Sequence, residues 1–344
     1  MIKYLLPKEG QFYKANLHCH TTLSDGKLTP EQVKEEYMKR GYSIVAITDH
    51  ELLIPHPELA SDDFLPLIGT EIGLDDDGTD MGSRRKCFHS CMIALDPDNI
   101  NDPIWNRTDY FPFGNIDANR HKCSFDENKP DFVRVYNSEG RSAAMTEGSK
   151  NGFFVTFNHP RWSLDKYEDY ITYEGMTALE IYNNGCYVGG HLDYTPEIYD
   201  EFLRAGKKIF CTASDDNHNF RAVDSPRTDS FGGFTMIKAP ELEYRAVGNA
   251  LKNGHFYASR GPIIEELWYD DEEKKVHIKT GNAKKIVCSS NTRLPRIVYA
   301  VEQGKEYINE AVFDIQQYDT YFRITVYDEN DLTANTNAYF VEDL

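Results

Sequence analysis

Three stretches near the start of the chain decide the fold class: KANLHCH at residues 14–20, TPEQ at 29–32 and SIVAITDH at 43–50. The first and third are apolar runs that end in side chains able to bind metal. The middle stretch predicts a helix start, because Thr29 suits the N-cap, Pro30 the first helical position and Gln32 a capping box. A strand, a helix and a buried strand in this order predict a βαβ unit with candidate ligands at the strand ends.

The same arrangement returns later in the chain. Thr195 and Pro196 open a second predicted helix, and Gly206 ends it. Further apolar runs cover residues 64–68, 88–95, 153–157, 178–182 and 208–213. Strands that alternate with helices predict a parallel sheet, and this number of strands predicts closure into a TIM-like barrel. In such barrels the chemistry lies where strands meet their following loops, and every candidate ligand cluster except His89 falls there.

The rest of the sequence divides into an insertion and a C-terminal region. Residues 96–140 are polar with scattered aromatic side chains, and because loops of this length are usually functional or disordered we expect a lid over the site. After residue 261, alternating strands separated by turn residues predict a small antiparallel β domain at 262–344. About 250 residues suffice for one α/β barrel. We therefore predict two domains, a barrel at 1–261 and a β domain at 262–344.

The composition is that of a globular protein with an acidic surface. The chain has 37 basic and 56 acidic side chains, and the resulting formal charge of −19 opposes binding to a nucleic-acid backbone. Seven cysteines form no CxxC pair, and we interpret them as reduced thiols in a cytoplasmic protein. No apolar run has the length of a signal peptide or a membrane span, so no membrane partner is expected. The oligomeric state is not indicated.

Nine side chains that can bind metal form the candidate site: His18, His20, Asp25, His50, Glu71, His89, His159, Asp216 and His218. One zinc ion needs three or four ligands, so nine indicate a multinuclear centre of the kind that activates water against a phosphoester. Side chains at i and i+2 of a strand share a face, so His18 and His20 should point the same way, as should Asp216 and His218. A lone strand histidine is usually a hydrogen-bonded core residue. Gathered at one barrel mouth, however, these acids and imidazoles would be costly to bury without cations.

The order and spacing of these ligands resemble the PHP (polymerase and histidinol phosphatase) family. The resemblance covers roughly residues 14–260 and lies in six motifs: NLHCHT at 16–21, SDG at 24–26, TDH at 48–50, GTEI at 69–72, NHP at 158–160 and DNH at 216–218. It implies a distorted (β/α)7 barrel with a trinuclear metal site. The C-terminal sequence is more weakly similar to the tail of longer PHP proteins, and we expect its β domain to pack on the barrel.

The resemblance also implies how the ligands divide among three ions. One ion would take His18, His20, Glu71 and Asp216, a second would share Glu71 and add His89 and His159, and a third would take Asp25, His50 and His218. Mixed imidazole and carboxylate ligation suits Mn, Fe or Zn, so two or three such divalent ions are the expected cofactors. We interpret Asp49 and Asp215 as acceptors that orient the imidazoles, with simple strand-end caps as the alternative.

A hypothesis for the chemistry follows from these assignments. Two ions joined by Glu71 would hold a bridging hydroxide, a third would bind phosphate oxygens, and Glu71 and Asp216 would be the catalytic carboxylates. His191 is the candidate donor of a proton to the leaving group. Arg161 and Arg221 each follow a ligand motif and are candidates to bind the substrate phosphate, with surface salt bridges as the alternative.

The leading functional hypothesis is a phosphoric ester hydrolase that acts on a small phosphorylated metabolite, such as a nucleotide or a sugar phosphate. We expect the lid at 96–140 to set the substrate. One alternative is a nuclease or exonuclease acting on nucleic-acid ends, which the acidic composition disfavours. Another is a non-catalytic metal-binding regulatory module, which would normally have lost ligands. Hydrolysis of C–N bonds would need a catalytic lysine context that the sequence lacks.

Overall fold

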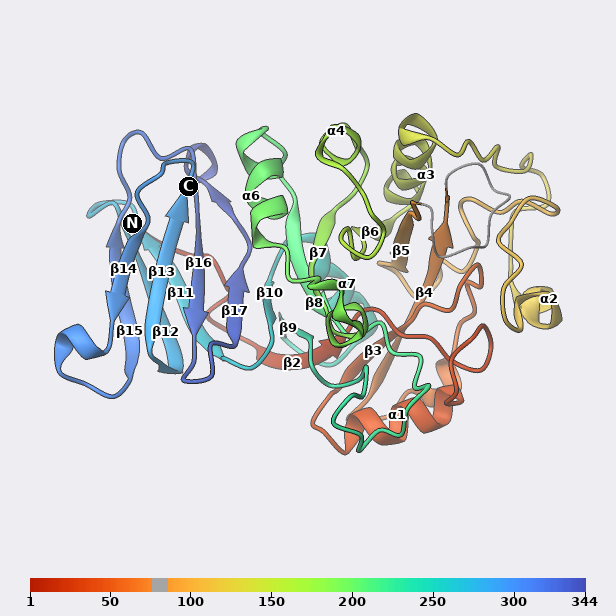
Figure 1. Cartoon of the computed structure of the whole chain (residues 1–344), viewed down its shortest axis with the longest axis horizontal. Coiled ribbons are helices and arrows are strands. Elements are labelled where there is room, and N and C mark those ends of the chain that lie inside the picture. Colours follow the sequence, from red (N-terminus) through yellow and green to blue (C-terminus); the bar gives the residue numbers. More distant parts are fainter. Residues whose placement is uncertain (76–85) are drawn as a thin grey trace.

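The computed structural model describes residues 1–75 and 86–344. An α/β part occupies one side of the molecule and a set of antiparallel strands the other (Figure 1). The strands of the α/β part are β2 (Gln11–Asn16), β3 (Ile44–Ile47), β4 (Leu65–Gly73), β5 (His89–Ala94), β6 (Phe153–Phe157), β7 (Ala178–Asn183), β8 (Phe210–Ser214), β9 (Phe234–Ala239) and β10 (Phe256–Ser259). Its helices are α1 (Pro30–Met38), α2 (Ile116–Asn119), α3 (Ser138–Lys150), α4 (Tyr167–Tyr170), α5 (Asn184–Cys186), α6 (Pro196–Arg204) and α7 (Tyr244–Lys252).

The predicted βαβ unit is present, and the residues predicted to start its helix do so. Thr29 caps α1 with both bonds of the capping box: its side chain accepts from the backbone N–H of Gln32, whose side chain accepts in return. Every residue of β3 and β4 is buried, as expected for strands covered on both faces. The second predicted helix is also present, because α6 begins at Pro196 and Gly206 follows it with a positive φ of 84°.

The sheet is mixed rather than wholly parallel. Strands β2, β3 and β4 run parallel, as do β6, β7 and β8, but β5 pairs antiparallel with both β4 and β6, and β9 pairs antiparallel with β2. The expectation of a parallel sheet is therefore wrong for β5, and β9 corresponds to none of the predicted apolar runs. An apolar run looks the same in either direction, so the sequence did not show that β5 is reversed.

Closure of the sheet into a TIM-like barrel is not confirmed. Within the described ranges, β8 is the last strand in the order of hydrogen-bonded ladders. Beyond the ends of β8 and β2, Cys19 and Asn217 form an isolated parallel bridge. There the N–H of Asp216 donates to the carbonyl of His18 at 3.0 Å. The fold is thus an α/β fold with a large mixed sheet and an antiparallel β region.

The antiparallel region consists of two sheets. Strands β1 (Ile2–Tyr4), β11 (Ile264–Asp270), β12 (Lys275–Ala283) and β15 (Ile308–Asp314) form one of them. The other contains β14 (Arg296–Tyr299), β13 (Lys285–Ser290), β16 (Tyr321–Tyr327) and β17 (Thr333–Thr336), with β18 (Tyr339–Phe340) beside β16. This second sheet continues into the α/β part, because β17 pairs with β10. The predicted boundary at residues 261 and 262 stays a prediction.

Direct contacts join the antiparallel strands to the α/β part. The guanidinium of Arg323 on β16 forks onto Asp200 of α6, with N–O distances of 2.7 and 2.8 Å. The side chain of Asn337 accepts from the N–H of Cys211 and donates to the carbonyls of Gly254 and Phe256, each at 3.0 Å. These bonds fix the C-terminal strands against α6 and β8. No helix in the described residues is long and apolar enough to cross a membrane.

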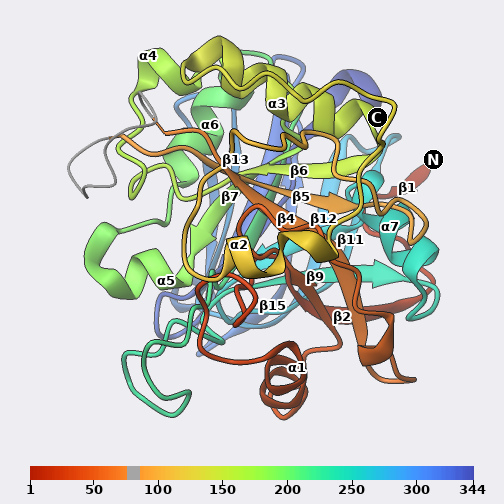
Figure 2. The same ribbon diagram turned by 90° about the vertical axis from the view of Figure 1, so that its right-hand side faces the viewer.

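The segment predicted to be a lid connects β5 to β6. It is largely irregular, with the short helix α2, and it ends where α3 begins at Ser138. Its middle part lies on the loop that follows β2. The backbone N–H of Asn115 donates to the carbonyl of Ser24 at 2.7 Å, and the side chain of Asn119 donates to the carbonyl of Leu23 at 2.9 Å. In the end-on view α2 lies in front of the strands (Figure 2).

Candidate metal centre

The nine predicted ligands come together in one cluster. His18, His20 and Asp25 follow β2, His50 follows β3, Glu71 lies near the end of β4, His159 follows β6, and Asp216 and His218 follow β8. Eight of the nine are buried, and His218 is partly exposed. Because the parallel strands end at the same edge of the sheet, side chains more than 140 residues apart in the chain meet there.

His89, the apparent exception, belongs to the same edge. It is the first residue of β5, and β5 runs opposite to β4, with His89 paired to Gly73. The start of a reversed strand lies beside the end of its neighbour. The reversal of β5, which was not predicted, therefore explains why His89 is found at the start of a strand rather than after one.

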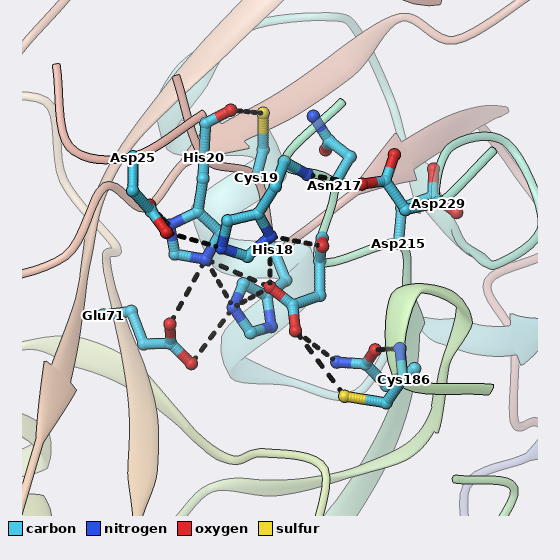
Figure 3. A network of polar contacts seen from close by, with 12 residues as sticks. His18, Cys19, His20, Asp25, Glu71, Cys186, Asp215, Asn217 and Asp229 are labelled. Atoms are coloured by element: carbon cyan, nitrogen blue, oxygen red, sulfur yellow. Dashed lines mark hydrogen bonds and ion pairs between the residues drawn. The ribbon is translucent and has the colours of Figure 1, made fainter. Parts of the chain in front are cut away.

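The innermost group contains two imidazoles between two carboxylates (Figure 3). His18 Nε2 lies 3.1 Å from Glu71 Oε1 and 3.2 Å from Asp216 Oδ1. His20 Nε2 lies 3.2 Å from Glu71 Oε2 and 3.1 Å from the same Asp216 oxygen. The two Nε2 atoms are 3.2 Å apart. These are the four residues that the family resemblance implies as the ligands of one ion.

Two further groups adjoin the first. One contains His20, Asp25, His50 and His218, with His218 Nε2 3.1 Å from Asp25 Oδ2. The other contains His50, Glu71 and His89, with Glu71 oxygens 3.2 Å from His50 Nδ1 and 3.5 Å from His89 Nδ1. The resemblance implies His159 in place of His50 in this last set. His159 Nε2 does lie 3.3 Å from Glu71 Oε1, so Glu71 contacts five imidazoles in all.

The chemistry of these donors fits bound cations. Glu180 accepts from His18 Nδ1 at 3.0 Å, so Nδ1 carries a hydrogen, and Nε2 points at two carboxylate oxygens, where either a proton or a metal ion can bind it. His218 repeats this arrangement: its Nδ1 donates to the carbonyl of Asp216 at 3.1 Å, and its Nε2 faces Asp25. Two lone pairs directed at each other repel unless a cation lies between them.

Unpaired buried atoms support the same interpretation. His20 Nδ1, His50 Nδ1, Glu71 Oε2 and Asp216 Oδ1 are buried without a hydrogen-bond partner among the described residues. Each lies within 3.1–3.7 Å of another ionisable group of the cluster, so their pairing depends on a proton or a metal ion between the two groups. Metal coordination would satisfy them, and we conclude that the cluster could hold divalent metal.

The ionisable groups of the cluster shift one another's pKa values strongly. Burial opposes the charged form of His18 and His20, yet the surrounding carboxylates, led by Asp216, hold the pKa of both well above the usual range. Burial together with the nearby His20 lowers the pKa of His50 to about 3. Burial acts against ionised Glu71 and Asp216 as well, but the imidazoles hold the pKa of both carboxyls below the ordinary value. Without metal the cluster therefore gathers protons in place of other cations.

Backbone strain is concentrated at this edge of the sheet. His159 and Asp216 have positive φ values of 28° and 52°, and Glu51 and Asn219, each next to a ligand, have 58° and 57°. Residues other than glycine rarely adopt positive φ values, and each such residue costs about 1–3 kcal/mol. The strain directs side chains of sharply turning loops into the cluster.

Two aspartates have roles other than the predicted one. Asp49 accepts from the backbone and hydroxyl of Thr21 and of Ser24, at 2.6–3.2 Å, and so orders the loop that carries Asp25. Asp215 accepts from the hydroxyl of Tyr37 and from the backbone N–H groups of residues 231–233, at 2.7–2.9 Å. The prediction that they orient imidazoles is therefore wrong, because both carboxylates point into the loops behind the ligands.

Glu180 fills that role and was missed by the sequence analysis. It is 2% exposed and binds His18 Nδ1, the backbone N–H of His159 and the side chain of Asn183. Asn158 also contributes, since its side chain donates to Glu71 Oε1 at 2.8 Å. The available signal was an acidic residue inside the apolar run at 178–182, where an unpaired carboxylate would be costly.

A cavity of about 490 Å³ opens beside the cluster. Seven of the nine candidate ligands line it, together with four aromatic side chains and His191: Asp25, His50, Glu71, His89, His159, Asp216, His218, Phe111, Phe113, Trp162, Phe220 and His191. Phe111 and Phe113 come from the segment predicted to be a lid, so this segment does reach the site.

The two arginines predicted to bind phosphate do not line this cavity. The guanidinium of Arg161 is about half exposed and pairs with Glu197. Arg221 is exposed on the loop after β8. In the described part of the chain, no lysine or arginine lines the cavity. A role for either arginine in phosphate binding stays a prediction, and for Arg161 it requires the pair with Glu197 to break.

Comparisons with known proteins agree with this geometry. A model of the PHP domain family matches residues 16–217. No curated protein matches the chain. Among solved structures, a two-domain protein from Bacteroides vulgatus that contains a predicted PHP-like metal-dependent phosphoesterase is 15% identical, with a TM-score of 0.44 and 98% of each chain covered.

Two other solved structures are similar at the same low level. A putative metal-dependent phosphoesterase from Bifidobacterium adolescentis is 18% identical, with a TM-score of 0.39, and the match covers 62% of this chain and 89% of the other. An amidohydrolase from Chromobacterium violaceum, with bound sulfate and no metal, is 15% identical, with a TM-score of 0.41 and coverage of 70% and 96%. These values carry no argument about function.

Proposed function

Because the chain belongs to the PHP domain family, we propose that it is a metal-dependent phosphoesterase that hydrolyses a small phosphorylated metabolite. The observation that carries this proposal is the buried cluster in which imidazole nitrogens and carboxylate oxygens face one another at 3.1–3.2 Å. Two or three divalent ions, of manganese, iron or zinc, are the cations that suit such donors. The cytoplasmic location predicted from the cysteines is part of the proposal.

The nine candidate ligands would hold these ions. When bound, the ions would supply positive charge that lowers the pKa of a water molecule and stabilises the charge developing on the phosphoryl oxygens. Glu71 contacts five imidazoles and so sets the spacing of the whole donor set. Glu180 holds His18 in the tautomer that presents Nε2 to the cluster.

His191 is the proposed proton donor to the leaving group. It lies on the cavity wall at the end of the turn Tyr187–His191, where Gly190 has a φ of 100° that favours glycine. Its side chain is exposed to the cavity and to solvent, so it can exchange protons with bulk water between turnovers. The lining residues Phe111 and Phe113 place one wall of the cavity in the proposed lid, which would exclude water from the reacting group.

Metal analysis followed by a phosphate-release screen tests the proposal. The purified protein, supplied with manganese, iron or zinc, would be assayed on nucleotides, sugar phosphates and bisphosphates, with single-stranded DNA as the nuclease control. We expect release from at least one small phosphoester, and its loss in His20→Ala and Asp216→Ala with the fold retained. His277→Ala, on a strand of the antiparallel region, is the matched control and should keep full activity. Turnover retained in both cluster variants would overturn the proposal.

A further inference from the structure

The cavity joins the metal-binding cluster to a set of aromatic rings. Three of the four rings lie beside imidazoles of the cluster. Phe113 lies 6.4 Å from His50 between ring centroids, at an interplanar angle of 87°. Trp162 lies 4.9 Å from His159 at 81°, and Phe220 lies 5.8 Å from His218 at 11°. The aromatic rings and the candidate ligands therefore form one continuous surface.

These rings come from three separate segments of the chain. Phe113 and its neighbour Phe111, stacked at 5.8 Å, belong to the segment between β5 and β6. Trp162 follows β6, and Phe220 follows β8. Phe113 is 41% exposed and Phe220 is 65% exposed, although burial of such rings is favourable. Large aromatic rings that converge in a cavity and remain exposed mark a place where an apolar part of a ligand binds.

Carboxylates occupy other parts of the wall. Asp75 accepts from the N–H of Phe88 at 3.0 Å. Asp229 accepts from the N–H groups of His218 and Asn219 at 2.9 and 2.8 Å. Both aspartates line the cavity and are held in place by these bonds, so they would repel a second anionic group on a ligand whose phosphate lies at the cluster.

We propose that this site selects phosphoesters whose leaving group carries a flat, uncharged aromatic ring, which binds against Phe113 and Trp162. This inference rests on the proposed phosphoesterase function and narrows its substrate class. An aryl phosphate and a nucleoside monophosphate share this chemistry, whereas a sugar phosphate or a bisphosphate lacks the ring or carries further charge. The cavity volume of about 490 Å³ is in the range of known small-molecule sites.

The test compares substrates that differ in the ring. The metal-loaded protein would be assayed on benzyl phosphate, adenosine monophosphate and glycerol phosphate, whose leaving groups are all ordinary alcohols. We expect kcat/KM at least about 10-fold higher for one of the two aromatic substrates than for glycerol phosphate, since stacking on one aromatic ring typically gives about this factor or more. Faster turnover of benzyl phosphate would place the ring close to the ester oxygen, and faster turnover of adenosine monophosphate would place it a ribose away. Equal or faster turnover of glycerol phosphate would overturn the inference.

Variants assign the effect to the ring of Phe113. Phe113→Ala should lower the ratio of kcat/KM for the preferred aromatic substrate to kcat/KM for glycerol phosphate about 10-fold, whatever its effect on turnover common to both substrates. Phe113→Trp, which keeps a ring, should retain the preference. Val133→Ala is the matched control, since Val133 is an apolar residue of the same segment and is 76% exposed. An equal loss on both substrates in Phe113→Ala would overturn the inference.

A binding measurement separates this inference from the proposed function. Phenylphosphonate and ethylphosphonate are not hydrolysed, so their affinities for the metal-loaded protein can be compared by calorimetry. Tighter binding of phenylphosphonate, with the difference reduced in Phe113→Ala, would support the aromatic site even if no phosphoester were turned over. Hydrolysis of phosphoesters without any preference for the ring, in turnover or in binding, would reject the aromatic site and leave the proposed function standing.

Discussion

Two buried polar regions of this molecule are built on opposite principles. Where the C-terminal strands meet α6 and β8, donors face acceptors: Arg323 forks onto Asp200, and its remaining NH1 group donates to Thr325 at 3.0 Å. In the metal-binding cluster imidazole nitrogens and carboxylate oxygens meet at 3.1–3.2 Å, and without metal the carboxylates raise the pKa of His18 and His20, so protons take the place of cations between them. The first region satisfies itself and stabilises the fold. The second needs cations from outside, which is the property expected of a functional site.

The sharpest way to break this comparison is to remove the charge at the centre of the cluster. Glu71→Gln keeps the shape of the side chain but presents an amide to five imidazoles. We expect loss of most bound metal, and a fall in phosphoester hydrolysis of about 1,000-fold, at the upper end of the effect of removing one electrostatic contact from an active site. Metal content by elemental analysis and initial rates would be measured together. Full metal content in the variant would show that the cluster does not need this carboxylate.

The next largest effect is expected where the C-terminal strands meet α6 and β8. Arg323→Ala leaves Asp200 without its partner, and breaking a buried ion pair typically costs about 3–5 kcal/mol. Asp200 is 22% exposed and can regain water, so we expect a loss of about 3 kcal/mol in the free energy of unfolding. Urea denaturation would measure it. Arg161→Ala, which removes an exposed pair with Glu197, is the control and should cost less than about 1 kcal/mol.

A smaller effect is expected at Glu180, which lies behind the candidate ligand His18. Glu180→Gln keeps an acceptor for the backbone N–H of His159 but weakens the charged bond that orients His18. Loss of such a supporting carboxylate typically lowers metal affinity about 10- to 100-fold. Metal titration would measure this loss. Glu58→Gln is the matched control, because Glu58 binds His56 Nδ1 at 3.1 Å outside the cluster, and it should leave the affinity unchanged. Equal affinities in the wild type and Glu180→Gln would show that the cluster orients His18 without help.

The extent to which the sequence predicts these two regions differs for physical reasons. The clustering of the candidate ligands was predictable because they recur at the ends of apolar runs, and the ends of parallel strands must meet at one edge. The start of α1 was predictable because Thr29, Pro30 and Gln32 act within one turn. Membership in the PHP family followed from the same motifs and is confirmed by the family match over residues 16–217.

What the sequence did not predict depends on pairing between distant segments. The direction of β5 is set by the route of the chain between β4 and β6, and an apolar run contains no sign of direction. The pairing of Arg161 with Glu197 and the position of Glu180 behind His18 depend on contacts across 36 and 162 residues. The lack of a further ladder on β8 among the described residues likewise involves distant residues, since Asn337 and Thr235 accept from the N–H groups of Cys211 and Ala213 there. Local patterns carry none of this information.

The smallest expected effect lies within the segment between β5 and β6, where the carboxylate of Asp102 is buried with few partners. Burial, reinforced by the nearby Glu51, raises the pKa of Asp102 to about 6 from an ordinary value of 3.8, although the N–H of Ile104 donates to it. Between these two values the folded protein binds the proton more tightly than the unfolded chain does. The free energy of unfolding should therefore fall as the pH rises from about 4 to about 6, and the full loss remains at higher pH.

Asp102→Asn removes this titration, so its effect depends on pH in a defined direction. At pH 7 the variant should be more stable than the wild type by on the order of 1–2 kcal/mol, and at pH 4 the two should be equal within error, because Asp102 is then protonated in the folded protein. Denaturant unfolding at both pH values would measure the difference, with the exposed residue Asp62→Asn as the control. A stability difference that does not change between pH 4 and pH 7 would mean that Asp102 is paired as well as Arg323 is, and that unsatisfied burial is confined to the metal-binding cluster.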